Sequence, residues 1–400
     1  MRVLLVQSHP VQYAAPLLRR YAREEGLDAR VAFLSLRGAA PSVDRDFGVE
    51  VAWDVPLLDG YAWTQPPDRA GSVARRLLGS VNPGLWRIVR RGAFDVVVCY
   101  GYRAASFWIA AVAAKSAGAK LMWATDATRI SPWARGPLHR WKVPVKKVAL
   151  PAIFGLADAV LAPSTRTVRF LSGIGVPPSR VFIAPFVVDN EFFERGAAAA
   201  DREAVRADWG VPADGLVALF AGKLAPWKRP GDLLEAAARV PEVFVVFAGD
   251  GVLREELAER ARHLGLAERV RFQGFVNQSA LPATYRAADV LVLPSEFEPF
   301  GLVVNEAFAS GTPAIVSTAC GAVDDLIREG ETGFTYPPGD VAALAGHLEA
   351  LARSPELRER LVRGARDQIG QWGVDQNVEA FTRAVRAVAR GGRADPESAS

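Results

Sequence analysis

Residues 290–311 read VLVLPSEFEPFGLVVNEAFASG, and the rest of the chain is organised around this stretch. Residues 290–294 form an apolar run of strand character, a polar loop with two acidic residues follows, and residues 301–311 have helical spacing between two glycines. This order predicts a strand, a tight loop and a helix whose N-terminus faces the loop. Because ligands bind at the carboxyl ends of parallel strands and a helix N-terminus carries partial positive charge, the loop suits an anion such as a pyrophosphate.

Two glutamates make this prediction more specific. Glu298 precedes Pro299 and is expected in the loop, whereas Glu306 lies inside the helix. Their spacing gives an axial separation of at most about 12 Å along a helix. In this arrangement one carboxylate could bind the hydroxyls of a sugar and the other the hydroxyls of a ribose, with a pyrophosphate between them. The alternative interpretation is a solvated acidic loop before a core helix.

The segment 298–316, EPFGLVVNEAFASGTPAIV, resembles the signature of the retaining GT-B glycosyltransferases of family 4. The resemblance implies an α/β fold of two Rossmann-like, doubly wound parallel-sheet domains that face a cleft. It also implies transfer of a sugar from a nucleoside-diphosphate sugar to an acceptor hydroxyl, with retention of configuration. In this interpretation Glu298 holds the sugar, Glu306 binds the ribose, and the donor also contacts the backbone in between, which comprises Pro299, Phe300, Gly301 and Leu302.

Two further segments of the second half resemble donor-binding motifs of this family. Residues 222–230, GKLAPWKRP, resemble its basic loop, in which Lys223 and Lys228 bind the donor diphosphate. The departing diphosphate gains negative charge, which fixed cations stabilise in the transition state, so that no metal or other cofactor is expected. Residues 272–278, FQGFVNQ, resemble the segment beside the nucleobase and place Phe275 and Val276 there. The alternative for the two lysines is ordinary surface charge.

Other motifs point away from competing chemistry. Residues 243–251, VFVVFAGDG, form an apolar run that ends in a glycine turn without the dinucleotide-binding pattern or a P-loop lysine, which disfavours NAD-dependent and kinase functions. Asp44, Arg45 and Asp46 imitate a metal-binding Asp-x-Asp motif, but they stand in a loop bordered by proline and glycine. We interpret them as surface charge and predict no metal site.

The first half alternates strand-like runs with segments long enough for helices. The runs are residues 2–7, 29–34, 94–100, 120–125 and 159–162, and they predict a parallel sheet with helices on both faces. His9 follows the first run, where family members often carry two glycines; it either contacts a substrate or stabilises the turn. Asp126 ends the fourth run, where relatives carry a histidine motif, and Arg129 is nearby. Asp126 either binds an acceptor hydroxyl or caps a helix.

Composition and charge predict the kind of partner and the cellular location of the protein. The chain has 400 residues and a net charge of +4. Residues 1–187 carry 25 Lys and Arg against 12 Asp and Glu, a balance of +13 that leaves −9 for the remainder and suggests an anionic partner. The basic, aromatic segment from Arg135 to Lys147 either contacts an anionic membrane or is ordinary solvated surface, and Pro144, which is expected to interrupt a helix there, favours the second interpretation. The two cysteines are not clustered, and the sequence has no secretory or membrane-spanning apolar run, which predicts a cytoplasmic protein. If the basic segment contacts the membrane, the protein is peripheral at its inner face. No nucleic acid is expected as a partner.

The expected domains are an acceptor-binding domain over 1–186, a nucleotide-sugar-binding domain over 187–369, a closing helix over 370–390 that packs back on the first domain, and a disordered tail over 391–400. The Gly- and Ala-rich run 196–200 is expected to be a loop. Two rival functions remain open. One is a GT-B-fold epimerase or phosphorylase, and the other is a catalytically silent binding partner in glycan assembly.

Overall fold

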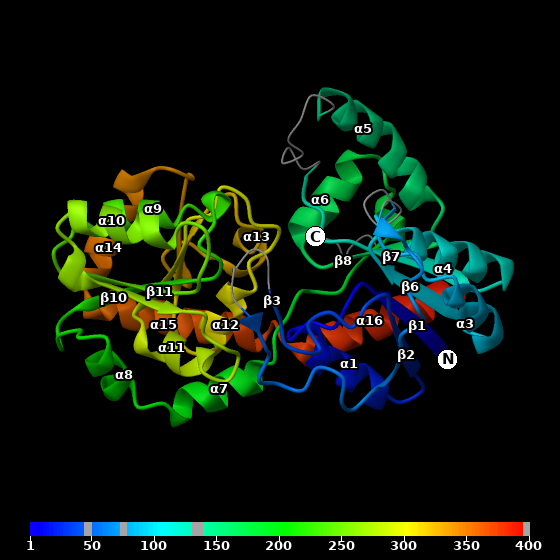
Figure 1. Cartoon of the computed structure of the whole chain (residues 1–400), viewed down its shortest axis with the longest axis horizontal. Coiled ribbons are helices and arrows are strands. Elements are labelled where there is room, and N and C mark those ends of the chain that lie inside the picture. The colour runs from blue at the N-terminus through cyan, green and yellow to red at the C-terminus, as the bar shows by residue number, and fades with distance from the viewer. Residues whose placement is uncertain (44–49, 73–77, 130–138, 395–400) are drawn as a thin grey trace. The chain divides into compact units, whose positions relative to one another are not determined.

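The computed structural model describes residues 1–43, 50–72, 78–129 and 139–394 (Figure 1). The chain divides into two compact units. The first contains Met1–Ala40, Pro56–Phe186 and Val374–Ser400, and the second contains Pro41–Val55 and Val187–Gly373. The segment 41–55, which the sequence analysis places in the first domain, therefore groups with the second unit. Three predicted features lie wholly or partly outside the described residues: the Asp44–Asp46 motif, residues 135–138 of the basic segment, and the tail from 395 onward.

The first unit is built on a parallel sheet with the strand order β5-β2-β1-β6-β7-β8-β9. The chain moves outward from β1 to β2 and then returns to add β6 on the other side of β1. The reversal makes the carboxyl ends of β1 and β6 a topological switch point, where open α/β sheets bind ligands. The strands are β1 Arg2–Gln7, β2 Asp28–Phe33, β5 Ala62–Thr64, β6 Val96–Tyr100, β7 Lys120–Ala124, β8 Ala159–Ala162 and β9 Val181–Ile183.

Helices cover both faces of this sheet, and the last helix of the chain is one of them. The ring of Tyr21 stacks on Phe381 at 4.2 Å, and its hydroxyl donates a hydrogen bond of 2.5 Å to Asn377. Asn377 in turn donates to the carbonyl oxygen of Pro185. The helices are α1 Ala14–Arg23, α3 Gly84–Gly92, α4 Ala105–Ser116, α5 His139–Gly155, α6 Thr165–Gly173 and α16 Val374–Ala389. None of the helices in the described part of the chain is long and apolar enough to cross a bilayer.

The second unit repeats this plan with the strand order β12-β11-β10-β13-β14-β15 and a short antiparallel pair, β3 with β4. Its switch point lies between β10 and β13. The strands are β3 Ser42–Val43, β4 Glu50–Val51, β10 Leu216–Ala221, β11 Val243–Ala248, β12 Val270–Gly274, β13 Val290–Leu293, β14 Ala314–Ser317 and β15 Gly333–Tyr336. The helices are α7 Asn190–Ala199, α8 Arg202–Asp208, α9 Pro230–Ala237, α10 Arg254–His263, α11 Leu281–Ala287, α12 Val303–Ala309, α13 Val323–Leu326, α14 Val341–Arg353 and α15 Pro355–Gly370.

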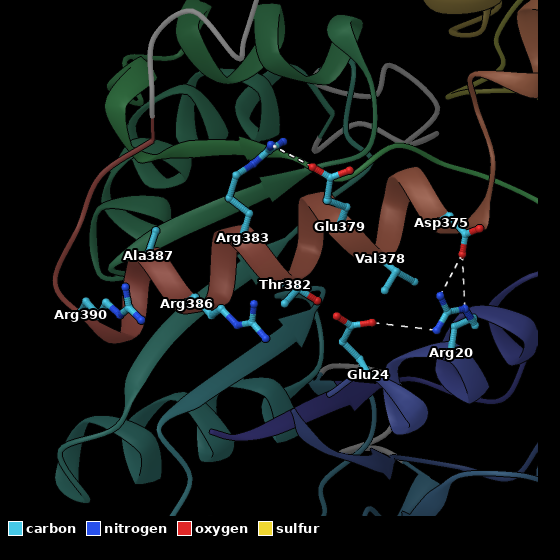
Figure 2. Close-up of a pocket in the computed structure, with 10 residues that line it drawn as sticks. All are labelled: Arg20, Glu24, Asp375, Val378, Glu379, Thr382, Arg383, Arg386, Ala387 and Arg390. Carbon is cyan, nitrogen blue, oxygen red and sulfur yellow. Dashed lines mark hydrogen bonds and ion pairs between the residues drawn. The ribbon is translucent and has the colours of Figure 1, made fainter. Parts of the chain in front are cut away.

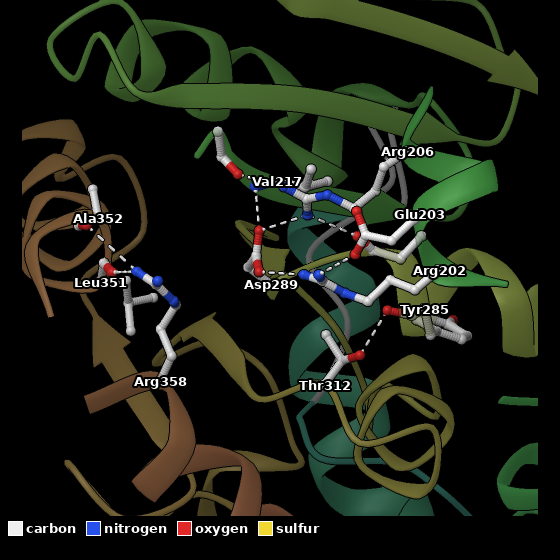
Figure 3. A network of polar contacts seen from close by, with 12 residues as sticks. Arg202, Glu203, Arg206, Val217, Tyr285, Asp289, Thr312, Leu351, Ala352 and Arg358 are labelled. Atoms are coloured by element: carbon white, nitrogen blue, oxygen red, sulfur yellow. Dashed lines mark hydrogen bonds and ion pairs between the residues drawn. The ribbon is translucent and has the colours of Figure 1, made fainter. Parts of the chain in front are cut away.

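A polar network fixes the amino ends of the two central strands (Figure 3). Asp289 directly precedes β13 and accepts a hydrogen bond of 2.7 Å from the backbone N–H of Val217 in β10. Its carboxylate also pairs with Arg206 at 3.0 Å and with Arg202 at 2.7 Å. Arg206 is only 3% exposed, and it donates a further bond to the carbonyl oxygen of Ala287. This buried charge is therefore fully paired, and the network sets where β10 and β13 begin.

Two local expectations are wrong. The run 196–200 is mostly helical, because α7 extends to Ala199 and alanine is the best helix former. A Cβ on Gly196 would lie 2.7 Å from Pro282, so that glycine allows α7 to lie close to α11. Helix α5 runs from His139 to Gly155 and so continues through Pro144, which was expected to interrupt it.

Candidate functional site

The basic loop follows β10 and is held by close backbone packing. A Cβ on Gly249, at the end of β11, would collide with the carbonyl oxygen of Gly222. The N–H of Leu224 donates to the carbonyl oxygen of Asp250 at 2.9 Å, which ties the loop to the same strand end. Lys223 therefore lies directly after the strand at the switch point, and it is half-buried.

Lys228 ends a 3₁₀ turn over Pro226–Lys228 and forms an ion pair with Glu298. The Lys228 and Glu298 side chains are 17% and 14% exposed. The next residue, Arg229, has a left-handed backbone with φ of 49° and forms a two-bond fork to Asp232 at 2.7 and 3.0 Å. The fork fixes the turn, and the turn positions Lys228 to reach the acidic loop after β13.

The acidic loop is fixed by the segment that follows β14. Gly321 donates to the carbonyl oxygen of Glu298 at 3.0 Å, and Ala322 donates to that of Phe300 at 2.8 Å. A Cβ on Gly321 would collide with the carbonyl oxygen of Pro299. Gly301 has φ of 102°, which favours glycine, and a Cβ there would also lie 2.9 Å from the Cys320 sulfur.

Glu306 lies in α12, which begins directly after Leu302. Its side chain is buried and accepts a hydrogen bond of 2.7 Å from the hydroxyl of Tyr285 in α11. Burial raises the pKa of Glu306 to about 7, and the hydrogen bond from Tyr285 opposes that rise. Glu306 is therefore poised to exchange its proton near neutral pH.

Phe275 and Val276 follow the end of β12, two strands away from β10 in the sheet. Both are half-buried. The ring of Trp53 meets the ring of Phe275 at 5.8 Å with an angle of 66° between the planes. Trp53 belongs to the segment 41–55, so residues from the first part of the sequence contribute to this edge of the second unit.

The acceptor-side candidates lie in the first unit. His9 follows β1 at the switch point, and its Nδ1 lies 2.9 Å from the Ser8 hydroxyl. Burial, together with the positive charge of Arg37, lowers the pKa of His9 and favours the neutral ring. Asp126 follows β7 and reaches the surface, where desolvation by neighbouring atoms raises the pKa of its carboxyl. Burial of the Tyr13 hydroxyl is the main cause that raises its pKa to about 12, and the negative charge of Asp126 adds to this rise.

Arg129 is exposed and follows Asp126 on the same connection.

A separate pocket of about 530 Å³ lies between α1 and α16 (Figure 2). Ion pairs line it, including Arg20 with Asp375 at 3.0 Å and Arg383 with Glu379 at 3.6 Å. Because both arginines and carboxylates line it, this pocket has a mixed charge, and no site residue predicted from the sequence lies in it.

The structure thus brings Lys228 and Glu298 into contact and places Lys223 on the same loop, with Glu306 on the helix that follows Glu298. His9, Asp126 and Arg129 belong to the other unit. Sequence reasoning missed Tyr285, Arg229 and Trp53. No local pattern marks Tyr285, because α11 reads LPATYRA and polar residues flank the tyrosine. The fork of Arg229 to Asp232 depends on a left-handed backbone, and the place of Trp53 depends on tertiary contacts.

Comparisons with known proteins agree with this arrangement. The family model for glycosyl transferases group 1 matches residues 201–368, and the model for the glycosyl transferase 4-like domain matches residues 10–186. The chain is 31% identical over 336 residues to D-inositol 3-phosphate glycosyltransferase 1 of Catenulispora acidiphila, which covers 80% of this chain and 78% of that protein. It is 38% identical over 248 residues to a D-inositol 3-phosphate glycosyltransferase of Geodermatophilus obscurus, over 58% of this chain and 53% of that protein.

Solved structures share the fold. Anabaena HepE in complex with UDP has a TM-score of 0.72 and 20% identity, over 96% of this chain and 100% of that one. A glycosyltransferase of Rickettsia africae has a TM-score of 0.74 and 15% identity, over 96% and 98% of the two chains. The predictions of a GT-B fold and of a glycosyltransferase that uses a nucleotide-sugar donor are confirmed. This chain belongs to the group 1, family 4 glycosyltransferases.

Proposed function

We propose that the enzyme transfers a sugar from a UDP-sugar to an acceptor hydroxyl with retention of the anomeric configuration. The observation that carries this proposal is the ion pair between Lys228 and Glu298. It joins the loops after β10 and β13, which flank the switch point of the second sheet. Complexes of Anabaena HepE with UDP and with UDP-glucose support uracil as the base of the donor.

The donor-binding roles follow from charge and position. Lys223 and Lys228 bind the diphosphate and offset the charge that it gains as the glycosidic bond breaks. Lys228 exchanges part of its contact with Glu298 for the phosphate, which leaves the Glu298 carboxylate to accept hydrogen bonds from sugar hydroxyls. Glu306 accepts hydrogen bonds from the ribose hydroxyls.

The remaining donor contacts come from the backbone and from two apolar side chains. The loop backbone from Pro299 to Leu302 completes the binding surface, with Phe300 buried beneath it. Phe275 and Val276 lie against the base. These assignments place the diphosphate at the switch point and the base toward β12.

The acceptor hydroxyl attacks the anomeric carbon on the face from which the diphosphate departs. Its proton passes to the leaving phosphate oxygen, so that no protein base is required. His9, Asp126 and Arg129 orient the acceptor; the neutral His9 ring and the Asp126 carboxyl offer hydrogen bonds, and Arg129 offers positive charge.

The excess of positive charge in residues 1–187 favours an acceptor that carries phosphate or an anionic lipid. The names of the curated relatives make D-inositol 3-phosphate the first small-molecule acceptor to test. We further propose that the reaction needs no metal and takes place in the cytoplasm. Residues 135–147 would then contact the anionic inner face of the membrane.

Titration calorimetry with UDP, GDP, ADP and TDP, with magnesium and with EDTA, tests the donor assignment. We expect UDP to bind equally well in both conditions and Glu306→Gln to weaken that binding. Glu349→Gln is a matched control, because Glu349 is a half-exposed carboxylate on α14 whose partner, Arg353, is also exposed. If none of the four nucleotides bound, the donor assignment would be wrong.

Release of UDP from UDP-glucose, with and without D-inositol 3-phosphate, tests the reaction class. We expect release to require an acceptor. Isomerisation of the sugar, or release that depends on inorganic phosphate alone, would instead indicate an epimerase or a phosphorylase.

A further inference from the structure

The segment 52–54 is held on the second unit by hydrogen bonds to the residues that follow Phe275 and Val276. Asn277 donates to the carbonyl oxygen of Ala52 at 2.6 Å and accepts from the N–H of Asp54 at 3.3 Å. The N–H of Ser279 donates to the Asp54 carboxylate at 3.2 Å, and the Ser279 hydroxyl donates to it as well. Contacts on both sides of Trp53 therefore fix its backbone beside β12.

These bonds place the indole ring of Trp53 against Phe275 in an edge-to-face contact, at 5.8 Å and 66°. Both residues are half-buried rather than fully enclosed. Two aromatic rings at this angle form a corner for a flat ligand ring, which stacks on one ring and meets the edge of the other. A nucleobase is such a ring, and base stacking on aromatic side chains is a strong and general contact.

The position of the corner agrees with the donor geometry. Phe275 follows the carboxyl end of β12, at the same sheet edge as the loops that carry Lys228 and Glu298. The strands of this sheet are parallel, and β11 and β10 separate β12 from β13. A nucleoside diphosphate with its phosphates at Lys228 would thus extend its base sideways toward β12.

We propose that Trp53 is a nucleobase-binding residue of the donor site, and that it forms one wall of the nucleobase pocket together with Phe275. This inference rests on the proposed function. It assigns part of the binding of the base to a residue from the first part of the sequence, far along the chain from the motifs proposed to bind the diphosphate and the ribose. Asp54 acts as a positioning residue, because its carboxylate anchors the segment to Ser279.

Calorimetry on the full chain with two probes tests this proposal. UDP carries a base, whereas inorganic pyrophosphate occupies only the phosphate site. We expect Trp53→Ala to weaken UDP binding by about 5- to 100-fold and to leave pyrophosphate binding unchanged. Trp53→Phe should restore most of the UDP affinity, because it keeps an aromatic face. Trp86→Ala is the control, because Trp86 is 43% exposed on α3 of the first unit. This variant should bind both probes with the affinity of the wild type.

Asp54→Ala separates positioning from direct contact. It keeps the indole ring but removes its anchor, and we expect a smaller loss of UDP affinity than in Trp53→Ala, again without a change for pyrophosphate. Equal weakening of both probes in Trp53→Ala, or no weakening of either, would overturn the proposal while leaving the donor assignment intact. If the wild-type chain bound pyrophosphate but none of the nucleoside diphosphates, both the proposed function and this inference would be wrong.

Discussion

The hydroxyl of Tyr285 donates a hydrogen bond of 2.7 Å to Oε2 of Glu306, and both side chains are buried in the second unit. The carbonyl oxygen of Tyr285 itself accepts a bond of 2.7 Å from the Thr312 hydroxyl (Figure 3). A buried carboxyl group with one fixed donor is therefore held at the helix that follows the acidic loop. This relationship leads to two predictions about pH and stability.

Glu306 should make the stability of the second unit fall as pH rises. Its folded pKa of about 7 exceeds its ordinary value of 4.5. Between these values the folded chain binds more protons than the unfolded chain, so the free energy of unfolding decreases until pH passes the folded pKa. Glu306→Gln removes this titration. We expect the melting temperature of the variant, relative to wild type, to increase from pH 5 to pH 8, as followed by circular dichroism. A difference that stays constant over this range would contradict the raised pKa.

Tyr285→Phe removes the hydroxyl that donates to Glu306 and should raise the pKa of that carboxyl further. We expect the pH-dependent loss of stability to extend to higher pH, and the free energy of unfolding at pH 8 to fall by about 1–3 kcal/mol. Tyr336→Phe is the matched control, since Tyr336 is equally buried and its hydroxyl has no hydrogen-bond partner among the described residues. Urea denaturation of both variants measures the difference. Equal effects would show that the Tyr285 hydroxyl has no special role.

The pair of Lys228 and Glu298 should behave as one coupled unit. Each side chain is largely buried, so that removing one leaves the other charge without its partner. We expect Lys228→Met and Glu298→Gln to lower stability separately, with the double variant recovering a coupling energy of about 1–3 kcal/mol. Lys228→Met should also lower kcat by about 10²- to 10³-fold, because the departing diphosphate loses a cation. Additive stability changes would show that the two groups do not interact in solution.

Two glycine substitutions should have opposite effects. Gly249 has φ of 155°, and a Cβ there would collide with the carbonyl oxygen of Gly222, so Gly249→Ala should displace the basic loop and lower both stability and UDP affinity. Gly346 lies within α14, and a Cβ there meets nothing within 4 Å. Gly346→Ala should therefore raise stability by about 0.5–1 kcal/mol. Thermal denaturation with and without UDP checks both expectations. Destabilisation by Gly346→Ala would contradict the open space around that residue.

The sequence predicted the parts of the site that depend on local order along the chain. The strand, loop and helix over 290–311 are recognisable because the hydrophobic pattern changes from strand to helix spacing within one segment. Glu298 and Glu306 were predicted as donor-binding residues from their place in that segment and from its resemblance to family 4, and Lys228 from the resemblance of residues 222–230 to the basic loop of that family. The structure adds the ion pair between Lys228 and Glu298, whereas the binding roles stay predictions.

The parts that sequence reasoning missed depend either on contacts between distant segments or on a local backbone conformation that the residue types do not reveal. Asp54 and Ser279 are 225 positions apart, and no local pattern indicates that the segment 52–54 lies on β12. Arg229 was visible in the basic loop, but its fork to Asp232 depends on a left-handed backbone that sequence alone does not reveal. The loop expected at 196–200 was wrong because low complexity was given more weight than the helix propensity of alanine.

The position of α16 has a consequence for how the protein is made. Phe381 and Val385 are buried in the same core as Leu5 and Val31, near the beginning of the chain. During synthesis, the ribosome must therefore release the chain to beyond residue 389 before the first unit can complete its core. Until then a hydrophobic face remains uncovered and available to chaperones. A version shortened before residue 374 should accordingly be recovered as aggregate, even though it retains every strand of both sheets.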